Sequence, residues 1–190
     1  SFYDPYTLTR NTEFIEVDEE NYYYTDRIGT EAARQIGEFA KSDKPFFQYV
    51  AFTAAHWPIH APEKSIQKYI KTYEGGWEKL RNERYARMIE MGIIDKEHWP
   101  LPQWEDRVKP WDTIDHKPWR IRNMAIYAAM VDHMDQAVGT LLEALKKTKR
   151  MENTFIIYFH DNGACPEHLS GNGWNTANNI LAKAEKAGKT

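Results

Sequence analysis

The chain has 190 residues, of which 42% are hydrophobic, and carries a formal net charge of −3. This length is enough for one domain with a real core, and the apolar content argues against disorder. The charge offers no basic patch for nucleic acid, and no apolar run approaches the roughly 18 residues that a membrane span needs. The single cysteine, Cys165, excludes an internal disulfide framework.

The first third of the chain predicts a helix followed by a buried strand. Residues 1–24 are polar and aromatic, which indicates an irregular segment with a short edge strand. From Thr25 to Ala40, apolar residues recur at helical spacing, and Thr25 is a candidate cap. Residues 46–53 are aromatic or β-branched and apolar on both faces, as in a central strand covered by helices. The predicted helical stripe is Ile28, Ala32, Ile36 and Phe39.

The rest of the chain repeats this order. Residues 63–122 are charged and rich in Trp and Pro, and we expect a surface insertion with one helix around Trp77–Met91. Ile121–Lys147 is the clearest helix, and residues 153–159 read as a second buried strand. The sequence therefore predicts an α/β fold with a mostly parallel central sheet flanked by helices. The expected stripe of the long helix is Met124, Tyr127, Val131, Met134, Val138, Leu141 and Leu145.

Polar residues follow both predicted strands, at the sheet edge where such folds bind ligands. Asp161 and Asn162 come directly after the second strand. Their carboxylate and amide oxygens suit Ca²⁺ or Mg²⁺, although Asp161, Asn162 and Gly163 are also compatible with an ordinary Asn-Gly turn. The placement after an apolar strand favours a metal site.

Two histidines follow the first strand, in a loop that spans residues 54–62. The i, i+4 spacing of His56 and His60 would suit a zinc pair on a helix, but Pro58 and Pro62 argue against a helix. Each histidine is either a partly buried loop residue or a donor to an anionic substrate. Because His56 follows the strand directly, we expect it to be held more rigidly than His60.

The remaining candidates are weaker. We expect four further histidines to be surface residues, and Asp132 and Asp135 to lie on a polar helix face or to tie helix to strand. Cys165 lacks the partners of a catalytic nucleophile and reads as a semi-buried thiol. These four histidines are His98, His116, His133 and His168, and the seventh, His160, stands directly before Asp161.

Three segments together resemble the type I sulfatases, the arylsulfatase family of the alkaline-phosphatase superfamily. Residues 44–62, KPFFQYVAFTAAHWPIHAP, are similar to the family's strand-and-histidine segment. Residues 127–142 resemble the helix before its last metal-ligand strand, and residues 153–163, NTFIIYFHDNG, resemble that strand. The order and spacing agree over essentially the whole chain.

The resemblance implies a calcium-dependent sulfuric-ester hydrolase acting on a sulfated small molecule or carbohydrate. Asp161 and Asn162 would be calcium ligands, His56 would contact the sulfate or the leaving-group oxygen, and His60 would touch substrate. In the family, a cysteine in a Cys-x-Pro-Ser-Arg motif becomes the formylglycine nucleophile. Cys165 is followed by Pro-Glu-His and does not match this motif, so the nucleophile is expected outside this chain.

Because this motif is absent from the chain, we expect residues 1–190 to be an internal part of one sulfatase catalytic domain that is inactive on its own. The alternative activity is that of a phosphatase or phosphonate hydrolase of the same superfamily. The alternative to an enzyme is an inactive fragment. The family resemblance also implies a periplasmic or secreted location.

Overall fold

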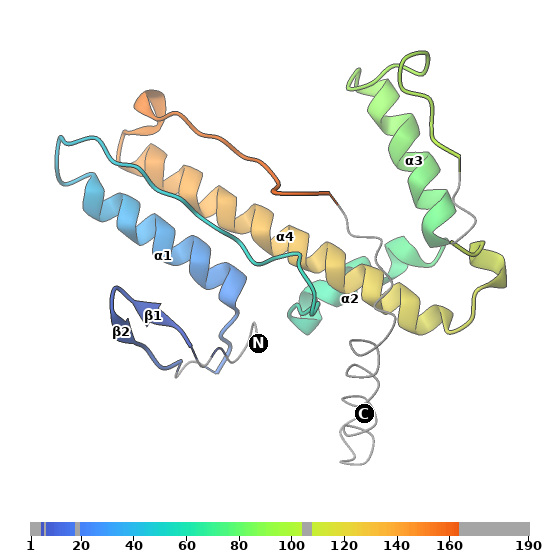
Figure 1. The fold of residues 1–190 in the computed structure, drawn as a ribbon, viewed down its shortest axis with the longest axis horizontal. Coiled ribbons are helices and arrows are strands. Elements are labelled where there is room, and N and C mark those ends of the chain that lie inside the picture. The colour runs from blue at the N-terminus through green and yellow to red at the C-terminus, as the bar shows by residue number, and fades with distance from the viewer. Residues whose placement is uncertain (1–4, 6, 18–19, 104–107, 164–190) are drawn as a thin grey trace. The chain divides into compact units, whose positions relative to one another are not determined.

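The computed structural model describes residue 5 and residues 7–17, 20–103 and 108–163. The chain divides into two compact units, Ser1–Thr154 and Phe155–Thr190, and each is described by itself. Figure 1 shows that helices dominate the described part of the first unit. Among residues 20–103 and 108–163, no helix combines the length and the apolar character that crossing a membrane requires.

The first unit opens with a small hairpin and a helix. Strands β1 (Thr9–Arg10) and β2 (Glu13–Phe14) pair antiparallel, and Asn11 in the turn has a φ of 56°. Asparagine tolerates this left-handed conformation better than most residues, which suits a tight turn. Helix α1 (Tyr24–Phe39) follows and buries the predicted Ala32 and Ile36. Its N-cap is Tyr23, and no side chain caps the helix, so the predicted cap at Thr25 is wrong.

Helix α4 (Lys117–Lys147) begins four residues before the predicted start at Ile121. The residues buried on it are alanines, methionines and one leucine, and they differ from the predicted stripe except at Met134 and Leu145. Tyr127 and Val131, which we expected in the core, are 49% and 38% exposed. The helix thus turns a different face to its neighbours in this unit. The buried residues are Ala125, Ala129, Met130, Met134, Ala137 and Leu145.

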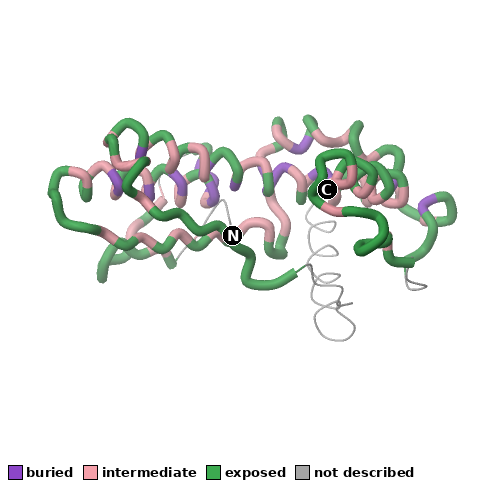
Figure 2. The backbone as a smooth tube through the Cα atoms, turned by 90° about the horizontal axis from the view of Figure 1, so that it is seen from above, coloured by how far each residue is buried: buried purple, intermediate pink, exposed green. Residues whose placement is uncertain are grey.

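The core lies where α4 meets α1 and α2 (Glu63–Tyr73). Ile66 of α2 is 3% exposed and belongs to the same buried cluster as Ala125, Ala129 and Met130 of α4. Figure 2 shows buried positions recurring along the helices, with exposed backbone outside them. Burying one isoleucine side chain contributes about 1.5–3 kcal/mol to the stability of the fold. Helix α2 is therefore part of the core, which the sequence pattern did not predict.

Helix α3 (Gly76–Glu90) matches its prediction within one residue at each end. A short helix, η1 (Trp111–Thr113), packs on its start, where the rings of Trp77 and Trp111 lie 4.9 Å apart. Gly76 has a φ of 79°, and a Cβ there would lie 2.2 Å from the Trp111 ring. Only glycine fits this close approach. Another short helix, η2, covers Met151–Asn153.

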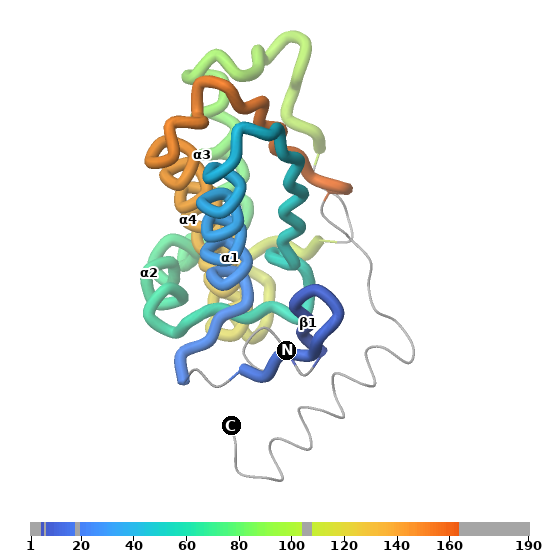
Figure 3. Tube along the Cα trace, turned by 90° about the vertical axis from the view of Figure 1, so that its left-hand side faces the viewer, coloured from blue at the N-terminus to red at the C-terminus, as the bar shows by residue number. Residues whose placement is uncertain are grey.

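The predicted parallel sheet is not found among the described residues. Residues 46–53 and 154–159 carry no strand pairing, and the sheet that the described chain does form is the antiparallel β1–β2 hairpin. Figures 1 and 3 show residues 46–53 as a long segment beside α1. A strand is defined by hydrogen bonds to a neighbouring strand, and neither segment has such a neighbour in the described chain.

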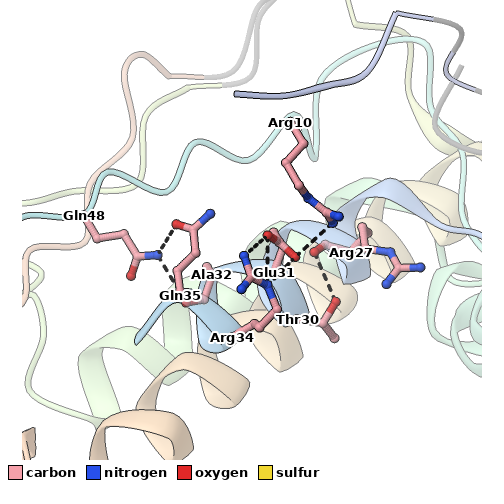
Figure 4. A network of polar contacts seen from close by, with 8 residues as sticks. All are labelled: Arg10, Arg27, Thr30, Glu31, Ala32, Arg34, Gln35 and Gln48. Carbon is pink, nitrogen blue, oxygen red and sulfur yellow. Dashed lines mark hydrogen bonds and ion pairs between the residues drawn. The ribbon is translucent and has the colours of Figure 1, made fainter. Parts of the chain in front are cut away.

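Polar contacts attach both the hairpin and residues 46–53 to α1 (Figure 4). The amide nitrogen of Gln48 donates to the Ala32 carbonyl at 3.2 Å and to Gln35 Oε1 at 3.1 Å. Arg10 of β1 reaches Glu31 at 3.5 Å. Arg34 hydrogen-bonds Glu31 and lowers the pKa of that carboxyl. The segment that leads to the two histidines is therefore fixed along α1.

Candidate functional site

The loop that carries both histidines, residues 54–62, is here named the histidine loop. Ala54 and Ala55 at its start and Ile59 in its second half pack on the helical core, and Ala61 is 7% exposed. The loop ends at Pro62, the N-cap residue of α2, whose carbonyl accepts the Ser65 N–H at 2.9 Å. The core thus holds both ends of the loop and leaves its middle outside.

His56 lies in that exposed middle. Its backbone N–H donates to the Thr53 carbonyl at 2.9 Å, which closes a turn directly after residues 46–53. The imidazole Nδ1 lies against the Trp57 carbonyl, and Trp57 itself is 57% exposed. If Nδ1 donates to that carbonyl, Nε2 is the ring nitrogen left to face an anionic substrate.

His60 is in a different environment. It is partly buried, and its backbone carbonyl accepts a hydrogen bond from the Tyr23 hydroxyl at 2.6 Å. Burial lowers the pKa of the His60 imidazole below its ordinary value of 6.5. We expected His60 to be the less constrained histidine, and the structure has the reverse order, because core contacts and the Tyr23 bond fix the second half of the loop.

The sequence reading missed a polar relay beside this loop. His133 Nδ1 lies 2.7 Å from Asp26 Oδ1, and His133 Nε2 lies 2.8 Å from Ser65 Oγ. The His133 side chain is 12% exposed, so the expected surface position is wrong. The three residues are here named the relay. They come from α1, α2 and α4, and no local sequence pattern links positions so far apart.

Asp132, next to the relay, ties two helices. Its carboxylate pairs with Lys68 of α2 at 2.8 Å, which lowers the pKa of Asp132. Glu63, at the start of α2, pairs with Arg122 of α4 at 2.6 Å, and this contact lowers the pKa of Glu63 to about 2. Together these pairs and the relay fix the first two turns of α2 against α4.

Asp161 and Asn162 lie in the second unit and are exposed. The Asn162 backbone N–H donates to Asp161 Oδ1 at 3.0 Å, and the Asn162 side-chain nitrogen donates to the Gly163 carbonyl at 2.8 Å. Both side chains keep oxygen atoms of the type that Ca²⁺ prefers, so they fit a calcium site. Two such residues supply only part of the six to eight oxygens that Ca²⁺ takes.

Within the described residues, no group of three or more His, Cys, Asp or Glu side chains could hold a metal ion by itself. Asp161 and Asn162 would therefore need further ligands. Cys165 and His168, whose roles we also considered, lie outside the described residues.

The family follows from the whole length of the chain. The sequence profile of the Sulfatase family matches residues 1–187. The chain belongs to the sulfatase family. The family resemblance of the three segments in the sequence is thus confirmed.

Individual sulfatases agree with this assignment. The arylsulfatase of Klebsiella aerogenes is 37% identical over 70% of this chain and 30% of its own length. An uncharacterized sulfatase of Schizosaccharomyces pombe is 35% identical over 76% of this chain and 26% of its own. Mouse arylsulfatase J is 26% identical over 83% of this chain and 18% of its own. The chain therefore spans less than a third of the length of these relatives.

A solved structure with a TM-score of 0.40, Ps i-CgsB in complex with k-i-k-neocarrahexaose, is 24% identical over 74% of this chain and 20% of its own. This likeness is too weak to define the fold.

Proposed function

We propose that this chain is part of a sulfuric-ester hydrolase of the arylsulfatase type, whose substrate is a sulfated small molecule or a sulfated carbohydrate. Membership of the sulfatase family supports the reaction class. The observation that carries the proposal is the histidine loop, in which His56 is exposed while core contacts hold both ends of the loop. A fixed loop with an accessible imidazole suits recognition of an anionic group.

In this proposal, His56 donates a hydrogen bond to the sulfate or a proton to the leaving-group oxygen. His60 acts from the better-packed half of the loop and contacts substrate without taking part in proton transfer. Such a division follows from the two environments, because the His56 imidazole is exposed, whereas desolvation lowers the pKa of the partly buried His60.

Asp161 and Asn162 would supply two oxygen ligands to Ca²⁺, which orients the sulfate and offsets its negative charge when bound. The remaining ligands and the formylglycine nucleophile would come from outside this chain. An amide oxygen at Asn162 suits calcium better than zinc, which favours the sulfatase over a zinc-dependent phosphatase.

We also propose that residues 46–53 and 154–159 join a parallel central sheet in the complete protein. Both segments are apolar and extended, and each leads directly to candidate site residues. The carboxyl ends of neighbouring parallel strands meet at one sheet edge, which would bring the histidine loop and Asp161 to the same side.

The activity is tested with a complete protein that contains this chain, assayed on an aryl sulfate and on the matching aryl phosphate. We expect a kcat/KM at least about 100-fold higher on the sulfate. A clear preference for the phosphate, or for a phosphonate ester, would replace the sulfatase with the alternative hydrolase. The 190-residue chain assayed alone should show no turnover, and activity there would contradict the proposed location of the nucleophile.

A further inference from the structure

The relay next to the histidine loop has a defined direction. An ionised Asp26 can only accept, so the 2.7 Å contact requires His133 Nδ1 to donate. In the tautomer with its proton on Nδ1, His133 accepts at Nε2 from the Ser65 hydroxyl, 2.8 Å away. Hydrogen bonds at both ring nitrogens lock the orientation of the imidazole and join α1, α4 and α2 through one side chain.

Tyr23 connects this relay to the loop. Its ring packs edge-on against His133, with the ring centroids 5.1 Å apart and the planes at 75°. Tyr23 is 4% exposed, and its hydroxyl donates to the His60 carbonyl at 2.6 Å. Ser65, at the other end of the relay, donates its backbone N–H to Pro62, the last residue of the loop. The relay therefore reaches the loop by two routes.

We propose that Tyr23 and His133 are positioning residues for the active-site loop of the sulfatase. His133 fixes the Tyr23 ring and the start of α2, and Tyr23 then fixes the loop at His60. Neither residue touches substrate in this arrangement. The proposal rests on the function proposed for His56, whose geometry depends on the fixed second half of the loop.

Serine, histidine and aspartate in this order also form the triad of serine hydrolases. Here the imidazole packs against a buried tyrosine, and the serine lies in the first turn of α2, between Glu63 and Lys68, which both pair with α4. This packing favours a structural link between helices over a nucleophile.

The test is a double-mutant cycle in a complete sulfatase that contains this chain. Tyr23→Phe removes the bond to His60 and keeps the ring against His133. We expect kcat on an aryl sulfate to fall about 3–10-fold, the loss of one net hydrogen bond, with the melting temperature nearly unchanged. In a His56→Ala background, the same change should cost less than about 2-fold, because the residue it positions is gone.

Tyr22→Phe is the matched control. The Tyr22 hydroxyl is also buried but has no hydrogen-bond partner in the part of the chain that the structure describes. Its removal should leave kcat unchanged. Ser65→Ala removes the hydroxyl that bonds to His133, and it should lower kcat as Tyr23→Phe does.

The outcomes separate the two proposals. An unchanged rate in His56→Ala would remove the proposed role of His56. The positioning role alone would be overturned if His56→Ala lowers kcat as expected but Tyr23→Phe leaves kcat unchanged. It would also be overturned if Tyr23→Phe lowers kcat by the same factor with and without His56. Labelling of Ser65 by a fluorophosphonate probe, detected by mass spectrometry, would also overturn it by showing a nucleophilic serine.

Discussion

His56 and His60 stand four positions apart on one loop, yet their surroundings suit different tasks. His56 is exposed, and its backbone N–H bonds to the Thr53 carbonyl. His60 is partly buried, and its carbonyl accepts a hydrogen bond from the Tyr23 hydroxyl. In a complete sulfatase, His56→Ala should lower kcat by about 10²–10⁴-fold, as expected for a lost proton donor. His60→Ala should mainly raise KM.

The leaving group distinguishes the two roles open to His56. An aryl sulfate whose phenol has a low pKa needs little protonation, so it should partly rescue His56→Ala if the imidazole is an acid. Equal losses across a series of phenols would instead assign His56 to sulfate binding.

The partly buried His60 also predicts a pH dependence of stability. Its pKa in the folded state lies below 6.5, so the unfolded chain binds a proton first as the pH falls. The His60 contribution is therefore complete above the unfolded pKa and is lost as the pH falls through the folded pKa. Between about pH 7.5 and about pH 5.5, the urea midpoint should fall more for the native chain than for His60→Gln. Equal falls of the urea midpoint in the two proteins would show that burial does not lower the pKa of His60.

At the scale of the helices, the contact of α1 with α4 depends on one small residue. A Cβ on Gly29 would lie 2.6 Å from the Ala137 Cβ and 2.9 Å from its Cα, so backbone would have to move. Gly29→Ala should destabilise the chain by about 1–3 kcal/mol, the usual range for overpacking. Gly37 on the same helix has no atom within 4 Å of its Cβ position.

Gly37→Ala is therefore the control, and it should stabilise the chain by about 0.5–1 kcal/mol through helix propensity alone. Chemical denaturation of both variants measures the difference. Equal effects of the two substitutions would mean that α1 does not approach α4 as closely as described.

Local patterns accounted for the helices better than for their faces. The spacing within Thr25–Ala40 was enough to find α1, because helical hydrogen bonds join residues near in sequence. Helix α2 carried a similar signal, with Ile66, Tyr69, Ile70 and Tyr73 at helical spacing, but its many charges concealed it. The buried face of α4 depends on which helices pack against it, and the sequence of α4 alone does not contain that information.

The candidate site divides in the same way. His56, Asp161 and Asn162 could be selected because they come after apolar segments, and His60 because it lies on the same loop as His56. The relay could not, since His133 is 68 positions from Ser65 and 107 from Asp26. Only the folded packing of three helices brings these side chains together.

On the scale of the whole molecule, the two predicted strands remain exposed apolar segments. Phe47 and Tyr49 are 90% and 72% exposed, and Phe155 and Ile157 are 89% and 67% exposed. Extended backbone with exposed aromatic side chains offers unpaired hydrogen-bonding groups and apolar surface together. In a complete sulfatase, neighbouring strands would cover both segments under our proposal.

The chain of 190 residues should therefore self-associate through these segments. We expect its weight-average mass in sedimentation equilibrium to rise with protein concentration, and Phe47→Lys with Phe155→Lys to suppress that rise, because charge on an exposed strand opposes edge pairing. Met91→Lys is the control, since Met91 is 60% exposed but caps the end of α3. Persistent association of the double variant, or equal suppression by Met91→Lys, would show that another surface joins the copies.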